Sequence, residues 1–232
     1  MELPVLSNRL LACCSFINSG DTVADIGCDH GYLGIYLLLK GIAKSVIAAD
    51  VNQQPLDSAY VNAQKYCVRD MMTFHLSDGA QNIPRQFDTL VCAGMGADTI
   101  ISILEGAPWL RSKNYHLVLQ CQSRRPVLRK YLDENGWHID SEILAKDGKF
   151  IYPVMSVSYT NSLGLTDAQR HISPALLESN DPLLPEFYDR VIEGLQTTVQ
   201  GLSNTGGEKY DYYSAVLREL LKLEADIHGN CC

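Results

Sequence analysis

The sequence lacks any long apolar run, and no stretch approaches the roughly 18 uncharged residues that a membrane-spanning helix needs. The first residues carry no basic segment followed by an apolar one, so we expect no secretory signal. The spacing of metal-binding residues is also missing, because no two cysteines stand in a C-x-x-C pattern and no series of Cys and His residues at metal-ligand spacing occurs. These absences predict a cytoplasmic protein with no membrane anchor and no bound metal.

Positive charge is scarce. The chain has 19 Lys and Arg against 27 Asp and Glu, a net charge of −8. Because phosphates repel a net anion, this balance disfavours non-specific nucleic-acid binding. The deficit is uneven, however: residues 1–159 hold 14 basic and 16 acidic residues, whereas residues 160–232 hold 5 and 11. A local basic face therefore remains possible in the first part of the chain.

Hydrophobic residues make up 46% of the 232 residues, which is enough to build a core and excludes general disorder. Several of the eight cysteines stand inside apolar strings, as Cys92 does. They are therefore expected to be free, buried thiols in a reducing compartment. Cys231 and Cys232 end the sequence and are expected to be exposed.

Short apolar segments alternate with helical patterns as far as residue 159. The predicted strands cover residues 22–26, 45–50, 73–76, 89–92, 116–120, 137–144 and 151–159, and the predicted helices cover 8–12, 32–39, 55–66, 99–105 and 126–135. This alternation predicts an α/β fold with a mostly parallel, Rossmann-like sheet. The last two strands flank a turn at 146–149 and are expected to form an antiparallel pair at one edge of the sheet.

The rest of the chain has a different character. Apolar residues at helical spacing predict two amphipathic helices, separated by the turn Ser203-Asn204-Thr205-Gly206-Gly207. We expect them to form a coiled-coil-like α-helical hairpin. The predicted domains are residues 1–160 and 161–232, with a linker at 161–164. The first domain is expected to fold without the second, and the hairpin to engage a partner rather than perform chemistry.

The loop after the first predicted strand reads Asp25-Ile26-Gly27-Cys28-Asp29-His30-Gly31. In doubly wound folds, ligands bind outside the carboxyl ends of the strands, and glycines there let the backbone turn tightly. The G-x-G-x-x-G fingerprint of nicotinamide dinucleotide sites is missing. The loop instead matches the D-x-G-x-x-x-G form of S-adenosylmethionine loops.

Acids and glycines recur at the next three strand ends. Asp50 is placed to accept hydrogen bonds from both ribose hydroxyls, and Asp78 from the adenine amine. Each acid taken alone also fits a loop cap or a solvated turn, but their joint order favours a cofactor site. The predicted cofactor-binding residues are Asp25, Gly27, Cys28, Gly31, Asp50, Val51, Asp78, Gly79, Ala93, Gly94 and Met95.

Several motifs together resemble the TrmK family, the bacterial tRNA methyltransferases that modify N1 of adenine 22. They are Leu6-Ser7-Asn8-Arg9-Leu10, residues 24–33, Ala93-Gly94-Met95-Gly96, Leu117-Val118-Leu119-Gln120 and Gly136-Trp137. The resemblance spans nearly the whole chain, including the helical tail. It implies a class I methyltransferase fold, S-adenosylmethionine as cofactor and tRNA as substrate, and we expect a monomer.

The chain departs from that family's pattern at several positions. Asp50 stands where Glu is usual, and Gly31 where Ala is usual. Cys121-Gln122 replaces Pro-Asn, and Pro153 replaces Glu after Tyr152. These differences bear on the geometry of the substrate side more than on the cofactor site.

Asp29 is the predicted catalytic residue. Adenine N1 already carries a lone pair, so the resemblance implies a reaction that needs positioning rather than deprotonation and gives a cationic ring. A carboxylate in the loop nearest the transferred methyl group, where many methyltransferases have Gly, suits that charge. The alternative is that Asp29 caps the next helix. His30 either lines the base pocket or bonds a backbone carbonyl, and Tyr32 is expected to pack.

The densest basic cluster follows the fifth predicted strand. It contains Arg124, Arg125, Arg129 and Lys130, and we predict that it contacts tRNA phosphates together with Arg9. The alternative is an ordinary solvated helix face. Two other function classes also stay open: a methyltransferase acting on a small molecule or protein, and a non-catalytic RNA-binding module that keeps the methyltransferase fold.

Overall fold

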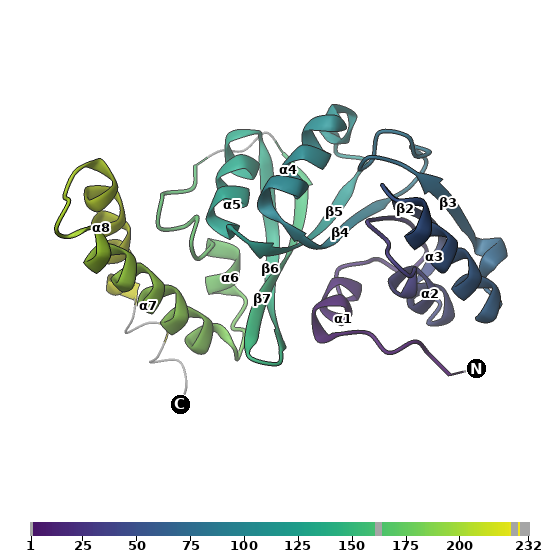
Figure 1. The fold of residues 1–232 in the computed structure, drawn as a ribbon, viewed down its shortest axis with the longest axis horizontal. Helices are drawn as coiled ribbons and strands as arrows, with labels where there is room; N and C mark the ends of the chain where they lie inside the picture. The colour runs from purple at the N-terminus through teal and green to yellow at the C-terminus, as the bar shows by residue number, and fades with distance from the viewer. Residues whose placement is uncertain (1, 161–163, 224–226, 228–232) are drawn as a thin grey trace.

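The fold is given by a computed structural model that describes residues 2–160, 164–223 and 227 (Figure 1). The strands are β1 (Asp21–Ile26), β2 (Ala43–Asp50), β3 (Met72–Leu76), β4 (Thr89–Gly96), β5 (His116–Ser123), β6 (Trp137–Asp147) and β7 (Phe150–Tyr159). The α-helices are α1 (Asn8–Cys14), α2 (Tyr32–Leu39), α3 (Gln53–Lys65), α4 (Ala97–Gly106), α5 (Arg125–Glu134), α6 (Pro174–Glu178), α7 (Leu184–Leu202) and α8 (Glu208–Leu220). Short 3₁₀ turns lie at Arg69–Met71, Pro108–Leu110 and Leu221–Leu223.

The strands of the described residues form one seven-stranded sheet in the order β3-β2-β1-β4-β5-β7-β6. The first five strands in that order pair in parallel, and β7 runs antiparallel to both β5 and β6. Both the predicted α/β sheet and its antiparallel edge pair are therefore confirmed. Because the five parallel strands point the same way, their carboxyl ends meet at one edge, where ligands bind in such folds.

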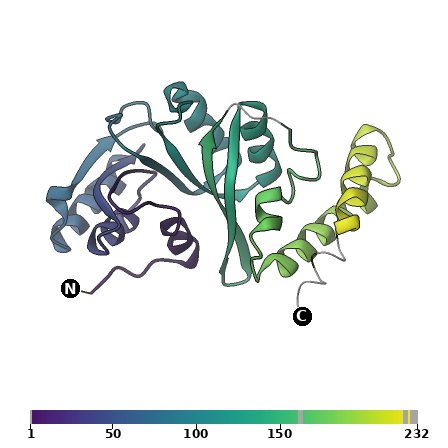
Figure 2. The same ribbon diagram turned by 180° about the vertical axis from the view of Figure 1, so that it is seen from behind.

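Helices cover both faces of the sheet (Figures 1 and 2). Buried residues of α4 and α5 pack with Ala24, Leu90 and Leu117 on one face. Those of α1, α2 and α3 pack with residues such as Val23 and Val91 on the other. Successive side chains of a strand point to opposite faces, so a sheet covered twice needs apolar residues at consecutive positions. This explains the unbroken apolar strings of the sequence.

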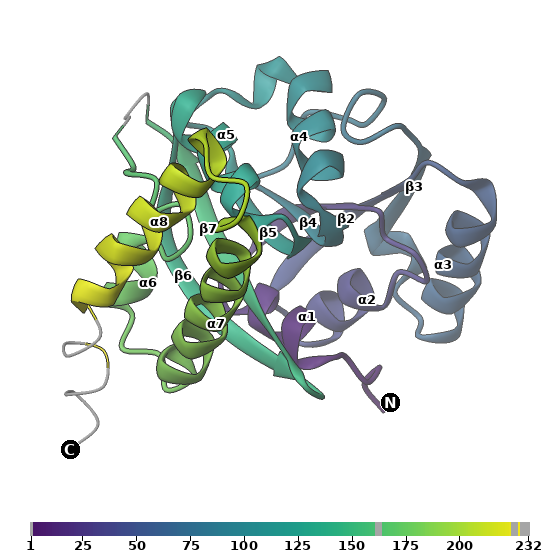
Figure 3. The same cartoon turned by 60° about the vertical axis from the view of Figure 1, so that its left-hand side comes forward.

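The predicted C-terminal helical hairpin is confirmed in the described residues. Figure 3 shows α7 and α8 side by side, and the Tyr188 hydroxyl donates to the Leu220 carbonyl at 2.9 Å. The apolar core of the hairpin also includes Leu144 of β6 and Ile151 of β7. The tail therefore packs against the antiparallel end of the sheet. The short helix α6 was not predicted, because its five residues are too few to show a period.

A buried ion pair lies where the tail meets the sheet. The Arg129 side chain is fully buried, and its guanidinium contacts the buried Glu142 carboxylate. Arg129 Nη1 also donates to the carbonyls of Arg170 (3.1 Å) and His171 (3.3 Å), and the Ser173 hydroxyl donates to Glu142. Buried charges need such partners to offset their lost hydration.

This arrangement argues against the expectation that residues 1–160 fold without the tail. Removing residues after 160 would strip two carbonyls and a hydroxyl from the buried charges. The division into domains 1–160 and 161–232 stays a prediction, and part of the expected linker, residues 161–163, lies outside the described residues.

The cysteines described by the structure are free, with Cys67 exposed and the others buried. Burial, with a contribution from the charge of Asp25, raises the pKa of the Cys14 thiol to about 12. Cys231 and Cys232 lie outside the described residues. Among the residues that the structure describes, none of the helices combines the length and apolar character needed to cross a membrane.

Replacing Arg129 with Met should lower the free energy of unfolding by about 3–5 kcal/mol, because the Glu142 charge is left buried without its partner. Urea denaturation of the full chain measures the loss. The double variant Arg129→Met/Glu142→Leu removes both charges and should lose much less than the sum of the two single variants. Additive losses would mean that the two charges do not stabilise one another.

Candidate active site

The first loop of the sheet edge begins at Asp25, whose side chain is 4% exposed. Among the described residues, its Oδ2 atom has no hydrogen-bond partner. Burial, followed by the negative charge of Asp50, raises the pKa of Asp25 to about 7. A buried carboxylate without a partner is costly, so this position favours a ligand that brings positive charge or a donor.

Two glycines shape the same loop. Gly27 and Gly31 have φ values of +71° and +72°, the left-handed region that favours glycine. A Cβ atom on Gly31 would lie 2.9 Å from the Cβ of Ala59, so α3 also packs too closely for a side chain there. A Cβ atom on Gly27 would lie 2.4 Å from Cε of Met95. The end of β4, which carries Met95, therefore packs closely against the loop after β1.

Asp29 does not cap α2, so that alternative is wrong. The N-cap of α2 is Gly31, and no side chain bonds to that helix end. The Asp29 carboxylate is instead 74% exposed, with Oδ1 3.6 Å from Nε2 of His30. The backbone of Asp29 has a φ of +50°, and its N–H donates to Oδ2 of Asp50 at 3.4 Å. The loop thus presents a solvent-facing carboxylate at the edge where the carboxyl ends of the parallel strands meet. We call this edge the catalytic edge.

Asp50 ends β2, and Asp78 follows the end of the neighbouring strand β3. Asp50 is 8% exposed, and its Oδ1 accepts from the N–H of Asn52 at 2.9 Å. The carbonyl of Asp50 accepts from the N–H of Ser77 at 2.9 Å, which ties the two strand ends together. Val51 is 62% exposed and Asp78 is also exposed, so both side chains are accessible at this edge.

The end of β4 depends on a residue that the sequence reasoning did not assign to the site. Gly94 has a φ of +81°, and its N–H donates to Oε1 of Gln120 at 2.8 Å. Gln120 is fully buried, and its Nε2 has no hydrogen-bond partner among the described residues. A polar residue ending the apolar run Leu117-Val118-Leu119 was the signal that could have identified it.

A hollow of about 400 Å³ lies beside the loop after β1, between α2 and α3. His30 and Tyr32 line one side, with ring centroids 5.9 Å apart. Gln54, Asp57, Ser58, Val61 and Asn62 line the other. Asn62 Nδ2 donates to the His30 carbonyl at 3.0 Å, which holds the loop against α3. The His30 ring lines the hollow, and its Nε2 atom lies 3.6 Å from Oδ1 of Asp29.

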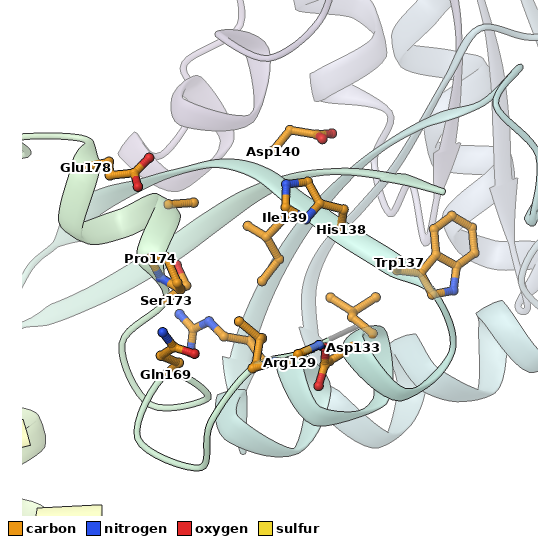
Figure 4. A pocket seen from close by; sticks show the side chains of 14 residues that line it. Arg129, Asp133, Trp137, His138, Ile139, Asp140, Gln169, Ser173, Pro174 and Glu178 are labelled. Carbon is orange, nitrogen blue, oxygen red and sulfur yellow. Dashed lines mark hydrogen bonds between the residues drawn. The ribbon is translucent and has the colours of Figure 1, made fainter. Parts of the chain in front are cut away.

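A larger cavity, of about 460 Å³, lies between α5, β6 and residues 164–178 (Figure 4). It is lined by residues such as Asp133, Trp137 and Asp140, and none of the predicted cofactor-binding residues lines it. Asp133 Oδ1 accepts from the N–H groups of Gly164 (2.7 Å) and Leu165 (3.2 Å), so this cavity belongs to the junction with the tail.

The predicted basic cluster after β5 is corrected by the structure. For Arg129 an RNA contact is wrong, because its side chain is buried in the ion pair with Glu142. Arg125 is half-buried, with Cζ 5.0 Å from the centre of the Phe187 ring, so it too belongs to the junction with the tail. Arg124 is exposed, and its Nη1 lies 2.5 Å from Oδ2 of Asp98. Arg125 and Arg129 fall on the side of α5 that faces residues 164–187, which the local sequence does not reveal. Lys130 is exposed, as Arg124 is, and an RNA contact of these two residues stays a prediction.

A D-x-G loop after β1, acids at or just after the ends of β2 and β3, and glycines at the end of β4 define a class I methyltransferase. The chain belongs to the methyltransferase-domain family, whose model matches residues 6–155. Among the described residues there is also no group of three or more His, Cys, Asp or Glu side chains able to hold a metal ion.

Comparison with known proteins narrows the family. The chain is 32% identical over 179 residues to a putative tRNA methyltransferase of Mycoplasma pneumoniae, covering 73% of this chain and 79% of that protein. It is 32% identical over 146 residues to the tRNA (adenine(22)-N(1))-methyltransferase of Bacillus subtilis. That alignment covers 62% of this chain and 61% of the Bacillus protein, so the chain spans less than two thirds of this relative.

A solved structure from Streptococcus pneumoniae, a putative tRNA (m1A22) methyltransferase, matches with a TM-score of 0.85 and 25% identity. The match covers 95% of this chain and 100% of the pneumococcal one, so the tail is included. The resemblance to the TrmK family is confirmed.

The stability of the protein should fall as the pH rises through 7, because of Asp25. Its pKa in the folded chain, about 7, lies above the ordinary value, so the folded state holds this proton more tightly than the unfolded state. The contribution of Asp25 to the free energy of unfolding is full below about pH 4 and is lost as the pH approaches and passes 7.

Asp25→Asn should flatten the pH dependence of unfolding between about pH 4 and 7, and should raise the cofactor-free stability at pH 8. Urea titrations at several pH values test this. Asp78→Asn, which removes an exposed carboxylate at the same edge, is the matched control. If the Asp25→Asn curve followed the wild-type curve, Asp25 would be ionised in the fold without cost.

Proposed function

We propose that this protein transfers the methyl group of S-adenosylmethionine to N1 of adenine 22 in tRNA. The observation that carries the proposal is the exposed carboxylate of Asp29, held in the cofactor loop and free of any capping role. The identity to the Bacillus enzyme supports the choice of substrate. We further propose that the protein acts in the cytoplasm as a monomer.

The residues at the sheet edge fit S-adenosylmethionine on two observations. The partnerless Oδ2 of the buried Asp25 favours a ligand with positive charge, which this cofactor carries. Gly27 has no side chain, so only its backbone lies beside the Met95 side chain. Asp50, Val51, Asp78 and Gly79 would hold the nucleoside part, and residues 93–95 the methionine part. The bound cofactor supplies an electrophilic methyl group on a sulfonium.

The chain's own task is then to position adenine and to stabilise charge. N1 of neutral adenine carries a lone pair in the ring plane and no proton, so no base has to remove a proton before attack. As the new bond forms, the ring becomes cationic, and the Asp29 carboxylate stabilises that charge and accepts from the exocyclic amine. His30, beside Asp29 and on the rim of the hollow, lines the base pocket. Because N1 lies on the pairing edge, adenine 22 must be unpaired or flipped out.

Transfer of a labelled methyl group to unmodified bulk tRNA, followed by mapping of the modified base, tests the proposal. Label at N1 of adenine 22 is the expected result, and a tRNA with guanine at position 22 should accept none. Transfer to protein or to small molecules alone would favour the second function class. Cofactor binding without transfer to any tRNA would favour a non-catalytic RNA-binding module.

Asp29→Ala should abolish most methyl transfer while leaving cofactor affinity within a few-fold. Asp29→Asn keeps the shape and an acceptor but loses the charge, and should raise the barrier by about 2–4 kcal/mol, as loss of one preorganised electrostatic group does. Single-turnover rates measure the change, and thermal melts show whether the fold is intact. A normal rate per folded molecule in both variants would remove Asp29 from the mechanism.

A further inference from the structure

The β6–β7 hairpin extends beyond the edge of the sheet that holds the candidate active site. Pairing of β5 with β7 ends at Gln120 and Val154, whereas pairing of β6 with β7 continues to Asp147 and Phe150. Since β7 is antiparallel to β5, this turn lies at the carboxyl ends of the parallel strands. Four further residues at about 3.3 Å each carry the tip roughly 13 Å past Val154. Figure 1 shows the tip between α1 and α7.

Two aromatic rings on this tip have a cation at either end of the row that they form. The Lys149 ammonium lies 5.3 Å from the centre of the Phe150 ring. The Phe150 and Tyr152 rings, two residues apart and hence on the same face, have centroids 6.0 Å apart. Cζ of Arg9, from α1, lies 5.8 Å from the centre of the Tyr152 ring. We call these four residues the cationic-aromatic strip.

The strip is built into the fold rather than left on a loose turn. Ser7 precedes α1, but its hydroxyl makes no capping bond. The Asp147 carboxylate replaces it, accepting from the N–H groups of Asn8 (2.9 Å) and Arg9 (3.3 Å). Asn8 Nδ2 also donates to the Lys146 carbonyl at 2.7 Å. An acid at a helix N-terminus is stabilising, so the hairpin tip and α1 hold one another in place.

Helix α7 supports the opposite side of the tip. Lys146 Nζ lies 2.7 Å from Glu186 Oε2, and Arg190 Nη2 lies 2.7 Å from Glu186 Oε1. Arg190 Nη1 also donates to the Lys149 carbonyl. The carboxylates bonded here, Asp147 and Glu186, are thus already engaged. The ammonium of Lys149 stays exposed.

Phe150 is the most informative member of the strip. It is 53% exposed, at the end of a hairpin that α1 and α7 hold rigid. In a chain of net charge −8, the tip gathers Arg9, Lys146, Lys149 and Arg190 beside the catalytic edge. Lys146 and Arg190 are paired with Glu186. Cations with an exposed ring are the combination that binds unpaired nucleic acid, since phosphates meet the cations and a base stacks on the ring.

We propose that the cationic-aromatic strip binds the RNA strand that enters the active site, with Lys149 and Arg9 on phosphates and Phe150 stacked on an unpaired base. The assignment rests on the proposed function, because it takes tRNA as the substrate. It takes over the role predicted for Arg125 and Arg129, because Arg125 packs on Phe187 and Arg129 is paired with Glu142.

Fluorescence anisotropy measures the binding of an unmodified tRNA transcript to the 232-residue protein at several salt concentrations, and this measurement tests the strip. Phe150→Ala should weaken binding about 5- to 150-fold, the effect of losing one base stack. Phe150→Tyr keeps a ring and should bind nearly as the wild type does. Because Phe150 is exposed, thermal melts and cofactor affinity should stay unchanged in both variants.

Lys149→Ala should reduce the slope of log affinity against log salt by about 0.7–0.9, the loss of one phosphate contact. Lys65→Ala is the matched control: Lys65 is an exposed lysine whose ammonium lies 5.8 Å from the centre of the neighbouring Tyr66 ring, but at the end of α3. For Lys65→Ala, the slope of log affinity against log salt should equal that of the wild type.

The outcomes separate the two proposals. If the wild type methylates tRNA, but Phe150→Ala and Lys149→Ala bind as it does, the strip is overturned and the proposed function stands. If Phe150→Ala weakens tRNA binding but the wild type transfers no methyl group to tRNA, the strip stands and the proposed function fails. If the wild type does not bind tRNA at all, both fail.

Discussion

Five parallel strands bring their carboxyl ends to one edge of the sheet, and the proposed chemistry depends on that edge. Asp25 is the second-last residue of β1, Asp50 ends β2, and Asp78 follows β3, so three acids far apart in sequence belong to three neighbouring strands. The same edge explains why Asp25 is costly to ionise, since the charge of Asp50 adds to its burial. A site built this way concentrates negative charge where a cationic cofactor and a ring that becomes cationic would be bound.

The antiparallel end of the sheet serves a second purpose. The strands β6 and β7 contribute Leu144 and Ile151 to the core of the helical tail, and Glu142 to the buried ion pair with Arg129. The same two strands then continue past the catalytic edge as the hairpin tip. One antiparallel pair therefore connects the tail rigidly to the region where we propose that RNA enters. The tail can influence substrate binding through this connection without contributing a catalytic group.

The distribution of charge fits an enzyme that must bind a polyanion selectively. With a net charge of −8, the chain has little general attraction for nucleic acid. Two of its arginines are used within the fold: Arg129 is paired with Glu142, and Arg125 packs on Phe187. Positive charge that remains near the catalytic edge, as at Lys149, then orients a bound RNA strand and does not promote non-specific binding.

The sequence by itself determined the α/β fold, the order of its elements, the helical hairpin and the composition of the cofactor loops. These follow from local periodicity and from glycines and acids at strand ends, which are visible within a few residues. Only the tertiary structure decided the surroundings of individual side chains. Arg129 and an exposed arginine look alike in a helical pattern, and what distinguishes them is a partner such as Glu142, on another strand, and the carbonyls of residues 170 and 171. Likewise Asp29 resembles a helix cap until the position of Gly31 is known. Burial and pairing depend on contacts between residues distant along the chain, and a local pattern does not contain them.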